Sequence, residues 1–319
     1  MTLSKPVIFL RYCIFLVLFI SFSQGSAQPM AKPYTNSRFM EVDSVQIHYR
    51  IWNDDLEHPK GSVVFVHGFT GSTFCWRKNV DTLVQQGYRV VAFDLPSFGY
   101  SERKPELNQS QSNRARLTWK LLEQIDGTDT VRWHVVGHSM GGGIAEAMAL
   151  MEPGRTKSLT IVAGMVFTKN QNMTGAFVVT AQNKQFRKIY SDILEDNFLT
   201  YNRMRKSLKS AYQREPDSSE VMGYLTPLQI EGTAEAILGV WANAKEVEKF
   251  SSDSLKNTSV LLIWGTKDRW IPKSSAKSFI KSVPSARVDL ITGAGHIPME
   301  THSYIFNSLL VDFLNSHYQ

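Results

Sequence analysis

Cysteine is scarce in this chain of 319 residues, which contains two, Cys13 and Cys75. Cys13 lies in an N-terminal segment that we expect to be removed, so one thiol remains. A single thiol cannot form a disulfide within the chain, and the fold therefore does not depend on disulfide bridges for its stability. We expect Cys75 to occupy a small apolar position in the core.

The sequence also lacks an apolar run long enough to span a membrane. Its N-terminal run, Tyr12–Phe22, has 11 residues, whereas a spanning helix needs roughly 20. Lys5 and Arg11 precede the run and small residues up to Ala27 follow it, which is typical of a secretory signal peptide. We therefore expect residues 1–27 to be cleaved and the mature protein to be periplasmic or secreted, with no stable membrane insertion. The alternative is an uncleaved anchor.

Positive charge is scattered along the chain and is not gathered into a nucleic-acid-binding motif. The net charge is +6, and 20% charged against 43% hydrophobic residues is typical of a globular protein. The short basic group at residues 203–209 fits the solvated face of a helix. Neither a cluster of metal-ligand residues nor a Gly-rich phosphate loop with its lysine stands out. We expect no cofactor, no metal and no nucleic-acid partner, but a small-molecule substrate. The sequence leaves the oligomeric state open.

Short apolar segments rich in β-branched residues alternate with segments of helical pattern. This alternation predicts an α/β fold with a doubly wound, mostly parallel sheet that helices cover on both faces. The predicted strands lie within residues 44–52, 61–68, 88–96, 131–139, 158–164, 259–268 and 286–296.

The alternation breaks between residues 166 and 250, about 85 residues that show helical patterns and no clear strand. Ordinary crossover helices are one interpretation, but the length favours a helical cap inserted between two strands. We therefore predict a core of residues 28–165 and 251–319 and a cap of residues 166–250. We expect most cap aromatics to form the core of the cap and some to face the strand ends. They are Phe177, Phe186, Tyr190, Phe198, Tyr201, Tyr224 and Trp241.

The stretch Gly137–Gly141 reads Gly-His-Ser-Met-Gly. A strand pattern precedes it and a helical pattern begins just after Met140, so Ser139 lies at a strand-to-helix turn. Such a turn strains the backbone of the serine and requires residues without side chains beside it, which Gly137 and Gly141 supply. The turn would expose the hydroxyl of Ser139, which makes this serine a candidate nucleophile.

A serine nucleophile needs a base, and the base needs a carboxylate to orient it. His296 directly follows the last predicted strand, and Asp268 follows the strand before it. Ser139, Asp268 and His296 thus lie at or just beyond the C-terminal ends of strands, where open α/β sheets place their active sites. Asp94 follows a different strand, and we expect it to stabilise a turn.

Two backbone N–H groups are candidates for binding an oxyanion. Phe69 comes just after the strand that ends at His67, and Met140 follows Ser139 at the start of a helix. We expect the N–H groups of Phe69 and Met140 to form an oxyanion hole and the ring of His67 to brace the loop.

With these stretches the sequence resembles the α/β-hydrolase fold superfamily, and within it the capped branch with a serine nucleophile. That branch includes carboxylesterases, C–C bond hydrolases and cofactor-free haloperoxidase-like proteins. The likeness extends over about residues 39–314 and departs at Ser97, where the family more often has glycine. The matching stretches are "HGF" from His67, "DLPSFGYS" from Asp94, "GHSMGG" from Gly137, "GTKD" from Gly265 and "GHIP" from Gly295.

The resemblance implies hydrolysis through an acyl-enzyme, with Ser139 as nucleophile, His296 as base and then acid, and Asp268 as the orienting group. We expect an exported serine hydrolase that acts on a small or medium ester or a similar acyl compound. The alternatives are a C–C bond hydrolase or aminopeptidase of the same fold, or a ligand-binding relative that retains the three residues without catalysis.

The signal-peptide interpretation predicts a mature N-terminus near Gln28. Mass spectrometry of the protein isolated from cells measures this end directly. A mature protein that retains Met1–Phe22 in the membrane would instead identify the segment as an anchor.

Overall fold

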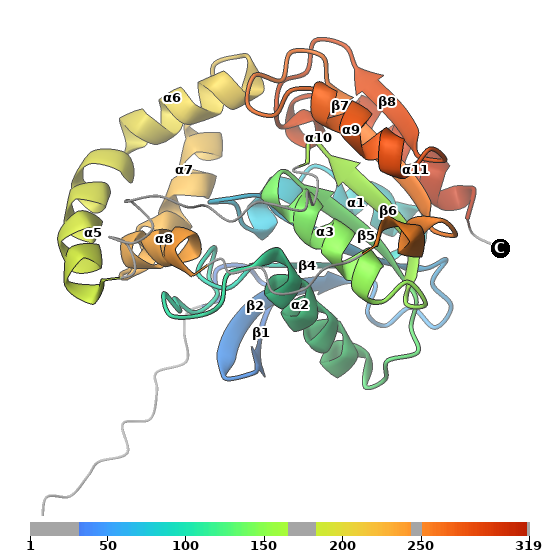
Figure 1. Cartoon of the computed structure of the whole chain (residues 1–319), viewed down its shortest axis with the longest axis horizontal. Helices are drawn as coiled ribbons and strands as arrows, with labels where there is room; N and C mark the ends of the chain where they lie inside the picture. The colour runs from blue at the N-terminus through green and yellow to red at the C-terminus, as the bar shows by residue number, and fades with distance from the viewer. Residues whose placement is uncertain (1–31, 165–182, 244–250, 318–319) are drawn as a thin grey trace, which may run out of the picture. The chain divides into compact units, whose positions relative to one another are not determined.

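Eight strands form one sheet at the centre of the fold (Figure 1). The computed structural model describes residues 32–164, 183–243 and 251–317, and residues 33–319 form one unit. The expected signal peptide, residues 1–27, lies outside the described residues. The strand order is β1-β2-β4-β3-β5-β6-β7-β8. The strands are β1 (Ser37–Val42), β2 (Val45–Trp52), β3 (Ser62–Val66), β4 (Arg89–Phe93), β5 (Trp133–His138), β6 (Thr156–Val162), β7 (Ser259–Gly265) and β8 (Arg287–Ile291).

The pairing of β3 with β4 and β5, and of β5 through to β8, is parallel. Strand β2 runs antiparallel to both β1 and β4. Parallel strands carry their C-terminal ends to one edge, so the segments that follow β3, β5, β7 and β8 emerge on the same side of the sheet. The predicted mostly parallel sheet is therefore confirmed.

Strand β1 was not predicted from the sequence. It is an edge strand that pairs with β2 alone, and it carries polar as well as apolar residues, so its apolar pattern is weak. Asp43 and Ser44 join the two strands with φ values of 48° and 60°. Two successive positive φ values are the mark of a tight two-residue hairpin turn.

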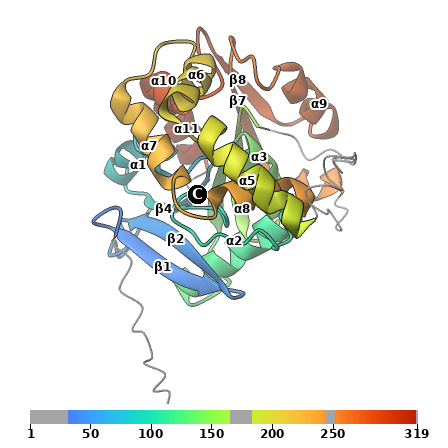
Figure 2. The same ribbon diagram turned by 90° about the vertical axis from the view of Figure 1, so that its left-hand side faces the viewer.

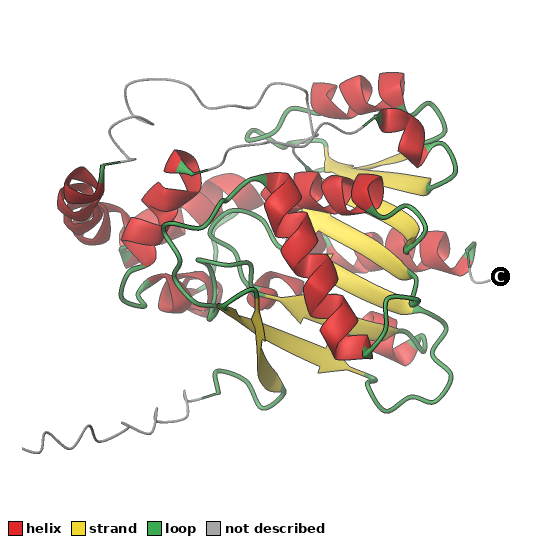
Figure 3. Ribbon diagram, turned by 60° about the horizontal axis from the view of Figure 1, so that its bottom comes forward, coloured by secondary structure: helices red, strands yellow, loops and turns green. Residues whose placement is uncertain are grey.

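Helices cover both faces of the sheet (Figure 3). Val64 and Val66 of β3 pack in one apolar cluster with residues of α2, α3 and α9, whereas Val63 and Phe65 pack in a second cluster with residues of α1 and α11. Successive side chains of a strand point to opposite faces, and both faces are therefore buried. The core helices are α1 (Val80–Gln85), α2 (Gln111–Asp126), α3 (Met140–Met151), α9 (Ser274–Ser282), α10 (Pro298–Thr301) and α11 (Ser303–Asn315), with short 3-10 helices η1 (Thr73–Trp76) and η2 (Ser252–Leu255).

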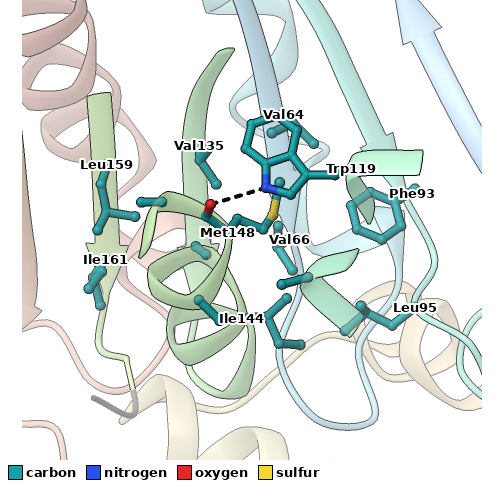
Figure 4. Packing of buried hydrophobic residues seen from close by; sticks show 14 of the residues in the cluster. Val64, Val66, Phe93, Leu95, Trp119, Val135, Ile144, Met148, Leu159 and Ile161 are labelled. Carbon is teal, nitrogen blue, oxygen red and sulfur yellow. Dashed lines mark hydrogen bonds between the residues drawn. The ribbon is translucent and has the colours of Figure 1, made fainter. Parts of the chain in front are cut away.

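Helices α2 and α3 are joined across the first cluster by a buried hydrogen bond. The indole Nε1 of Trp119 donates to the main-chain oxygen of Met148 over 3.0 Å (Figure 4). This bond satisfies the one polar group of a large apolar side chain, so Trp119 can fill the core between the helices without a desolvation cost. The first turn of α3, which carries the residues next to Ser139, is thus held on a packed helix.

Within residues 183–243, between β6 and β7, the structure describes the cap helices α5 (Lys184–Phe198), α6 (Tyr201–Tyr212), α7 (Ser218–Leu228) and α8 (Thr233–Ala242). They lie together on one side of the sheet (Figures 1 and 2). Helix α5 packs on α8, and α6 packs on α7. The described part of the insert, residues 183–243, contains no strand, and the predicted α/β fold with an inserted helical cap is confirmed. The boundaries at residues 166 and 250 lie outside the described residues and stay predictions.

Four of the seven cap aromatics have described side chains. The rings of Phe186, Tyr190 and Tyr201 are exposed, and Tyr224 is buried. On α5 the buried stripe includes Arg187 and Ser191, which places the rings of Phe186 and Tyr190 on the next face of the helix. That most of the seven form the core of the cap stays a prediction. Phe177 and the side chains of Phe198 and Trp241 lie outside the described residues.

Cys75 is buried, and burial raises the pKa of its thiol, as expected for an apolar position. Among the described residues, no helix combines the length and the apolar character needed to cross a membrane.

The burial of His134 should make part of the free energy of unfolding depend on pH. Its ring is buried in β5, with Nδ1 2.7 Å from the hydroxyl of Ser158, and burial lowers its pKa from 6.5 to about 3. A lowered folded pKa means that the unfolded chain binds the proton more tightly, so stability present above pH 6.5 is lost as the pH falls. Acidification from pH 7 to pH 5 should therefore lower the free energy of unfolding by roughly 2 kcal/mol through this residue.

Urea denaturation at both pH values measures this loss. His134→Asn, whose amide can still meet Ser158, should lose less stability on acidification than the wild type. His58 is exposed, and His58→Asn is the matched control. Equal pH dependence in the wild type and His134→Asn would contradict the prediction.

Candidate active site

Ser139 lies in the one-residue turn between β5 and α3. Its φ and ψ are 53° and −120°, a region that residues with a side chain rarely adopt. A Cβ on Gly137 would lie 2.1 Å from the carbonyl oxygen of Gly141, so any larger residue would collide with the first turn of the helix. The N–H of Ser139 donates to Val162 at the end of β6 over 3.0 Å. The strained turn is thus fixed by glycine on one side and by the neighbouring strand on the other.

The structure brings Ser139, His296 and Asp268 together. His296 Nε2 lies 3.0 Å from Ser139 Oγ, and His296 Nδ1 lies 2.9 Å from Asp268 Oδ2. His296 is 2% exposed. Because a carboxylate only accepts, Nδ1 carries the hydrogen and Nε2 is left to accept the proton of the serine hydroxyl. The three predicted residues therefore form one hydrogen-bonded series.

Asp268 is itself held by the turn that follows β7. Its Oδ1 accepts the N–H groups of Trp270 at 2.8 Å and Ile271 at 3.1 Å. These bonds leave Oδ2 to face the imidazole of His296. The carboxylate is thus oriented by its own backbone, which fixes the direction of the ring that it binds.

The two residues predicted for the oxyanion hole lie on neighbouring segments. Strands β3 and β5 pair with Val66 opposite Gly137, so the segments that contain Phe69 and Met140 leave the sheet side by side. Met140 is the first residue of α3, and the N–H of a first residue has no acceptor within its own helix. His67 braces the loop as expected, because its Nδ1 binds the carbonyl of Gly68 at 2.7 Å and its Nε2 accepts the N–H of Leu95 at 2.9 Å.

His138 has a contact that the sequence did not predict. Its Nε2 lies 3.0 Å from the carbonyl oxygen of His296, and the centres of the two rings are 4.9 Å apart. Burial lowers the pKa of His138, so the ring is neutral at neutral pH and donates this bond. His138 thus supports the backbone of the histidine that faces Ser139.

A second Ser-His-Asp series lies elsewhere in the fold. His48 Nε2 is 2.7 Å from Ser37 Oγ, and His48 Nδ1 is 2.7 Å from Asp94 Oδ2. None of the three is more than 1% exposed, and Ser37 lies in the regular strand β1. Asp94 also accepts the N–H groups of Thr73 and Tyr100, which is the turn-stabilising role expected for it. A substrate cannot reach Ser37, so this series ties β1, β2 and the loop after β4 together.

Arg114 is a buried cation beside the candidate oxyanion residues. Its side chain from α2 is 1% exposed, donates to Gln109 Oε1 and Met140 Sδ, and lies over the ring of Phe98. The ring of Phe98 in turn meets that of Phe69 edge-on at 5.5 Å. Burial lowers the pKa of Arg114 to about 9, so it stays charged at neutral pH. It places a positive charge behind the segments that carry Phe69 and Met140.

Comparisons with known proteins identify the family of the fold. A family model described as the alpha/beta hydrolase fold matches residues 61–303. The chain is 27% identical, over 92% of its length and the whole of the relative, to a 2-hydroxy-6-oxononadienedioate/2-hydroxy-6-oxononatrienedioate hydrolase of Cupriavidus pinatubonensis. It is 28% identical, over 86% of its length and 67% of the relative, to a dihydrolipoyllysine-residue acetyltransferase component of an acetoin cleaving system of Cupriavidus necator.

Solved structures share the fold without sharing one chemistry. A serine hydrolase involved in carbazole degradation, CarC, superposes with a TM-score of 0.67 at 19% identity over 88% of this chain and 98% of the other. The epoxide hydrolase CorEH superposes equally well, with a TM-score of 0.67 at 16% identity over 88% and 98% of the two chains. The overall fold therefore does not select the reaction, and the residues of the site must.

Proposed function

The chain belongs to the alpha/beta hydrolase fold family, and from this premise we propose that it is a serine hydrolase that cleaves a small or medium ester through an acyl-enzyme. The observation that carries the proposal is the hydrogen-bonded series from Ser139 through His296 to Asp268, at distances of 3.0 and 2.9 Å. A serine in this position has a base within reach and a carboxylate that orients the base.

In the first half-reaction Ser139 Oγ attacks the carbonyl carbon of the ester while its proton passes to His296 Nε2. The carbonyl oxygen becomes an oxyanion, which the N–H groups of Met140 and Phe69 stabilise. Asp268 stabilises the imidazolium that forms. When the tetrahedral intermediate collapses, the C–O bond of the ester breaks and His296 Nε2–H gives its proton to the leaving alcohol. The acyl group remains on Ser139.

In the second half-reaction a water molecule takes the place of the alcohol. His296 accepts one of its protons as the oxygen attacks the acyl carbon, and returns that proton to Ser139 Oγ when the acyl–serine bond breaks. The carboxylic acid leaves and the three residues regain their starting protonation. Ester plus water thus yields acid plus alcohol with no other reactant.

The identity of the nucleophile argues against epoxide hydrolysis despite the shared fold. Opening an epoxide through a covalent alkyl-ester intermediate requires a carboxylate as the nucleophile, and the turn after β5 carries a serine hydroxyl. Acyl transfer is the reaction to which a Ser-His-Asp series is suited.

A C–C bond hydrolase is the second candidate, and the full-length similarity to the hydrolase of Cupriavidus pinatubonensis favours it. The same residues would attack a ketone carbonyl, and the leaving carbon would take the proton. Parallel assays with aryl esters and a 2-hydroxy-6-oxo dienoate separate the two candidates. Hydrolysis of an aminoacyl anilide would identify an aminopeptidase. If none of these three kinds of substrate is turned over, the protein is a ligand-binding relative.

We also propose that the protein acts outside the cytoplasm. The support is the basic start, short apolar run and small residues of the N-terminal segment.

Removing the nucleophile or the base should abolish most activity. Ser139→Ala and His296→Ala should each lower kcat by about 10³-fold or more, and the double variant should be little worse because the residues act as a unit. Steady-state kinetics on a short aryl ester measures these losses. A serine-directed phosphonate should label Ser139 in the wild type and fail to label Ser139→Ala.

Ser37→Ala is the matched control, because Ser37 belongs to the buried Ser-His-Asp series. It should keep kcat within about twofold and lower the free energy of unfolding by about 1–3 kcal/mol, since His48 would lose a buried partner. Wild-type turnover in folded Ser139→Ala would disprove the assignment of the nucleophile.

The cap predicts a preference among substrates. Its helices contact the loops that carry Asp268 and His296, and a covered site admits bulky or aggregated substrates poorly. We expect faster hydrolysis of soluble aryl esters with short and medium acyl chains than of emulsified triolein or casein. Initial rates on a graded ester series, measured beside those on emulsified triolein and on casein, test this. A higher rate on triolein or casein would contradict the covered site without touching the roles of the three residues.

A further inference from the structure

The C-terminal end of cap helix α6 is bonded to the segments that hold the candidate base. Three successive residues, Ser210, Ala211 and Tyr212, each make one hydrogen bond to the core. Their partners lie just after β7 and just after β8. The end of one cap helix therefore meets the two segments that carry Asp268 and His296.

The central contact is made by the histidine itself. The main-chain N–H of His296 donates to the carbonyl oxygen of Ala211 over 2.8 Å. The preceding residue, Gly295, approaches so closely that a Cβ on it would lie 2.2 Å from the same carbonyl oxygen. Only glycine allows this approach, so the backbone of the base is seated directly on the end of α6.

The second contact runs through Trp270. Its indole ring stacks on the imidazole of His296, with ring centres 5.1 Å apart and planes inclined by 27°. Its Nε1 donates to Ser210 Oγ over 3.1 Å, and its main-chain N–H donates to Asp268 Oδ1 over 2.8 Å. One residue thus touches the carboxylate, the imidazole and the cap.

The third contact runs through Glu300, in α10 just after the histidine. Its carboxylate is 1% exposed and accepts the hydroxyl groups of Tyr212, at 2.6 Å, and Tyr224. Arg77 from the core supplies the opposite charge at 2.5 Å. This buried carboxylate has partners on two of the cap helices and on the core, and it therefore ties α6 and α7 to the segment that follows β8.

We propose that the end of α6 holds His296 in reach of Ser139, and that Trp270 is the positioning residue through which the cap sets the orientation of the imidazole. This inference rests on the proposed function, because it assigns a role toward the proposed base. A displacement of about 1 Å in a reacting group can cost on the order of 10²-fold in rate. The packing of the cap on the core then also sets the position of the imidazole of His296.

A purely structural role for Trp270 makes a different prediction. If the ring served only to attach the cap, its loss would lower stability or change KM and leave kcat alone. If it positions the base, its loss lowers kcat and the rate of phosphonate inactivation by the same factor, because both reactions need the serine–histidine pair and share no leaving group.

Trp270→Ala, Trp270→Phe and Ser210→Ala test the proposal. Trp270 is 48% exposed, so these changes should leave the fold intact. Trp270→Ala should lower kcat on a short aryl ester about tenfold with KM within about threefold. Trp270→Phe keeps a ring over the imidazole and should recover most of the loss. Ser210→Ala should lower kcat about two- to threefold, and Ser207→Ala, one turn earlier in α6, is the matched control and should match the wild type.

Hydrogen exchange supplies a readout that does not need turnover. The amide of His296, bonded to Ala211, should exchange faster in Trp270→Ala and Ser210→Ala than in Ser207→Ala, measured on a peptide that spans residues 293–300. Unchanged exchange together with unchanged kcat in Trp270→Ala would overturn the positioning role. A wild type without ester turnover or phosphonate labelling would instead overturn the proposed function, and the exchange would still report on the contact between α6 and His296.

Discussion

The hydrogen bond between Ser139 Oγ and His296 Nε2 joins residues 157 positions apart. The rest of the structure has to bring these two residues within hydrogen-bond distance and keep them there. Ser139 follows β5, in the middle of the sheet, whereas His296 follows β8 at its edge. Sequence separation of this size carries a loop-closure cost that other contacts must offset. The parallel sheet brings the two residues to the same region, because the C-terminal ends of β5 and β8 lie on one side of it. The strained turn at Ser139 then lifts the hydroxyl above that edge, where His296 can reach it.

The segment after β8 must then reach back over the sheet, and its conformation depends on contacts from three directions. Asp268 holds the Nδ1 side of the ring, His138 holds the carbonyl of His296, and Ala211 of the cap holds its N–H. Each bond comes from a different part of the chain. The position of the base is thus over-determined, which is how a residue can be kept within hydrogen-bond distance of a strained nucleophile.

The two Ser-His-Asp series have the same residue types but lie at different places in the fold. Their hydrogen-bond distances are similar, between 2.7 and 3.0 Å. One serine lies in a regular buried strand, and the other lies in a turn at the strand ends, next to a helix start. A set of side chains becomes a candidate active site because of where the backbone places its nucleophile, and the same set in the core acts as a satisfied polar network.

The sequence by itself determined what depends on neighbours along the chain. The apolar runs predicted β2 to β8, the glycines around Ser139 predicted the turn, and the positions of Asp268 and His296 after their strands predicted which residues meet, because parallel strands share an edge. Tertiary structure alone decided the contacts between distant segments. These are the pairing of the weakly patterned β1, the buried series at His48, the bond from His138 to His296, and the seat of His296 and Trp270 on α6. No local pattern encodes them, because each side chain finds its partner only after the sheet has fixed the loops and the cap has packed against them.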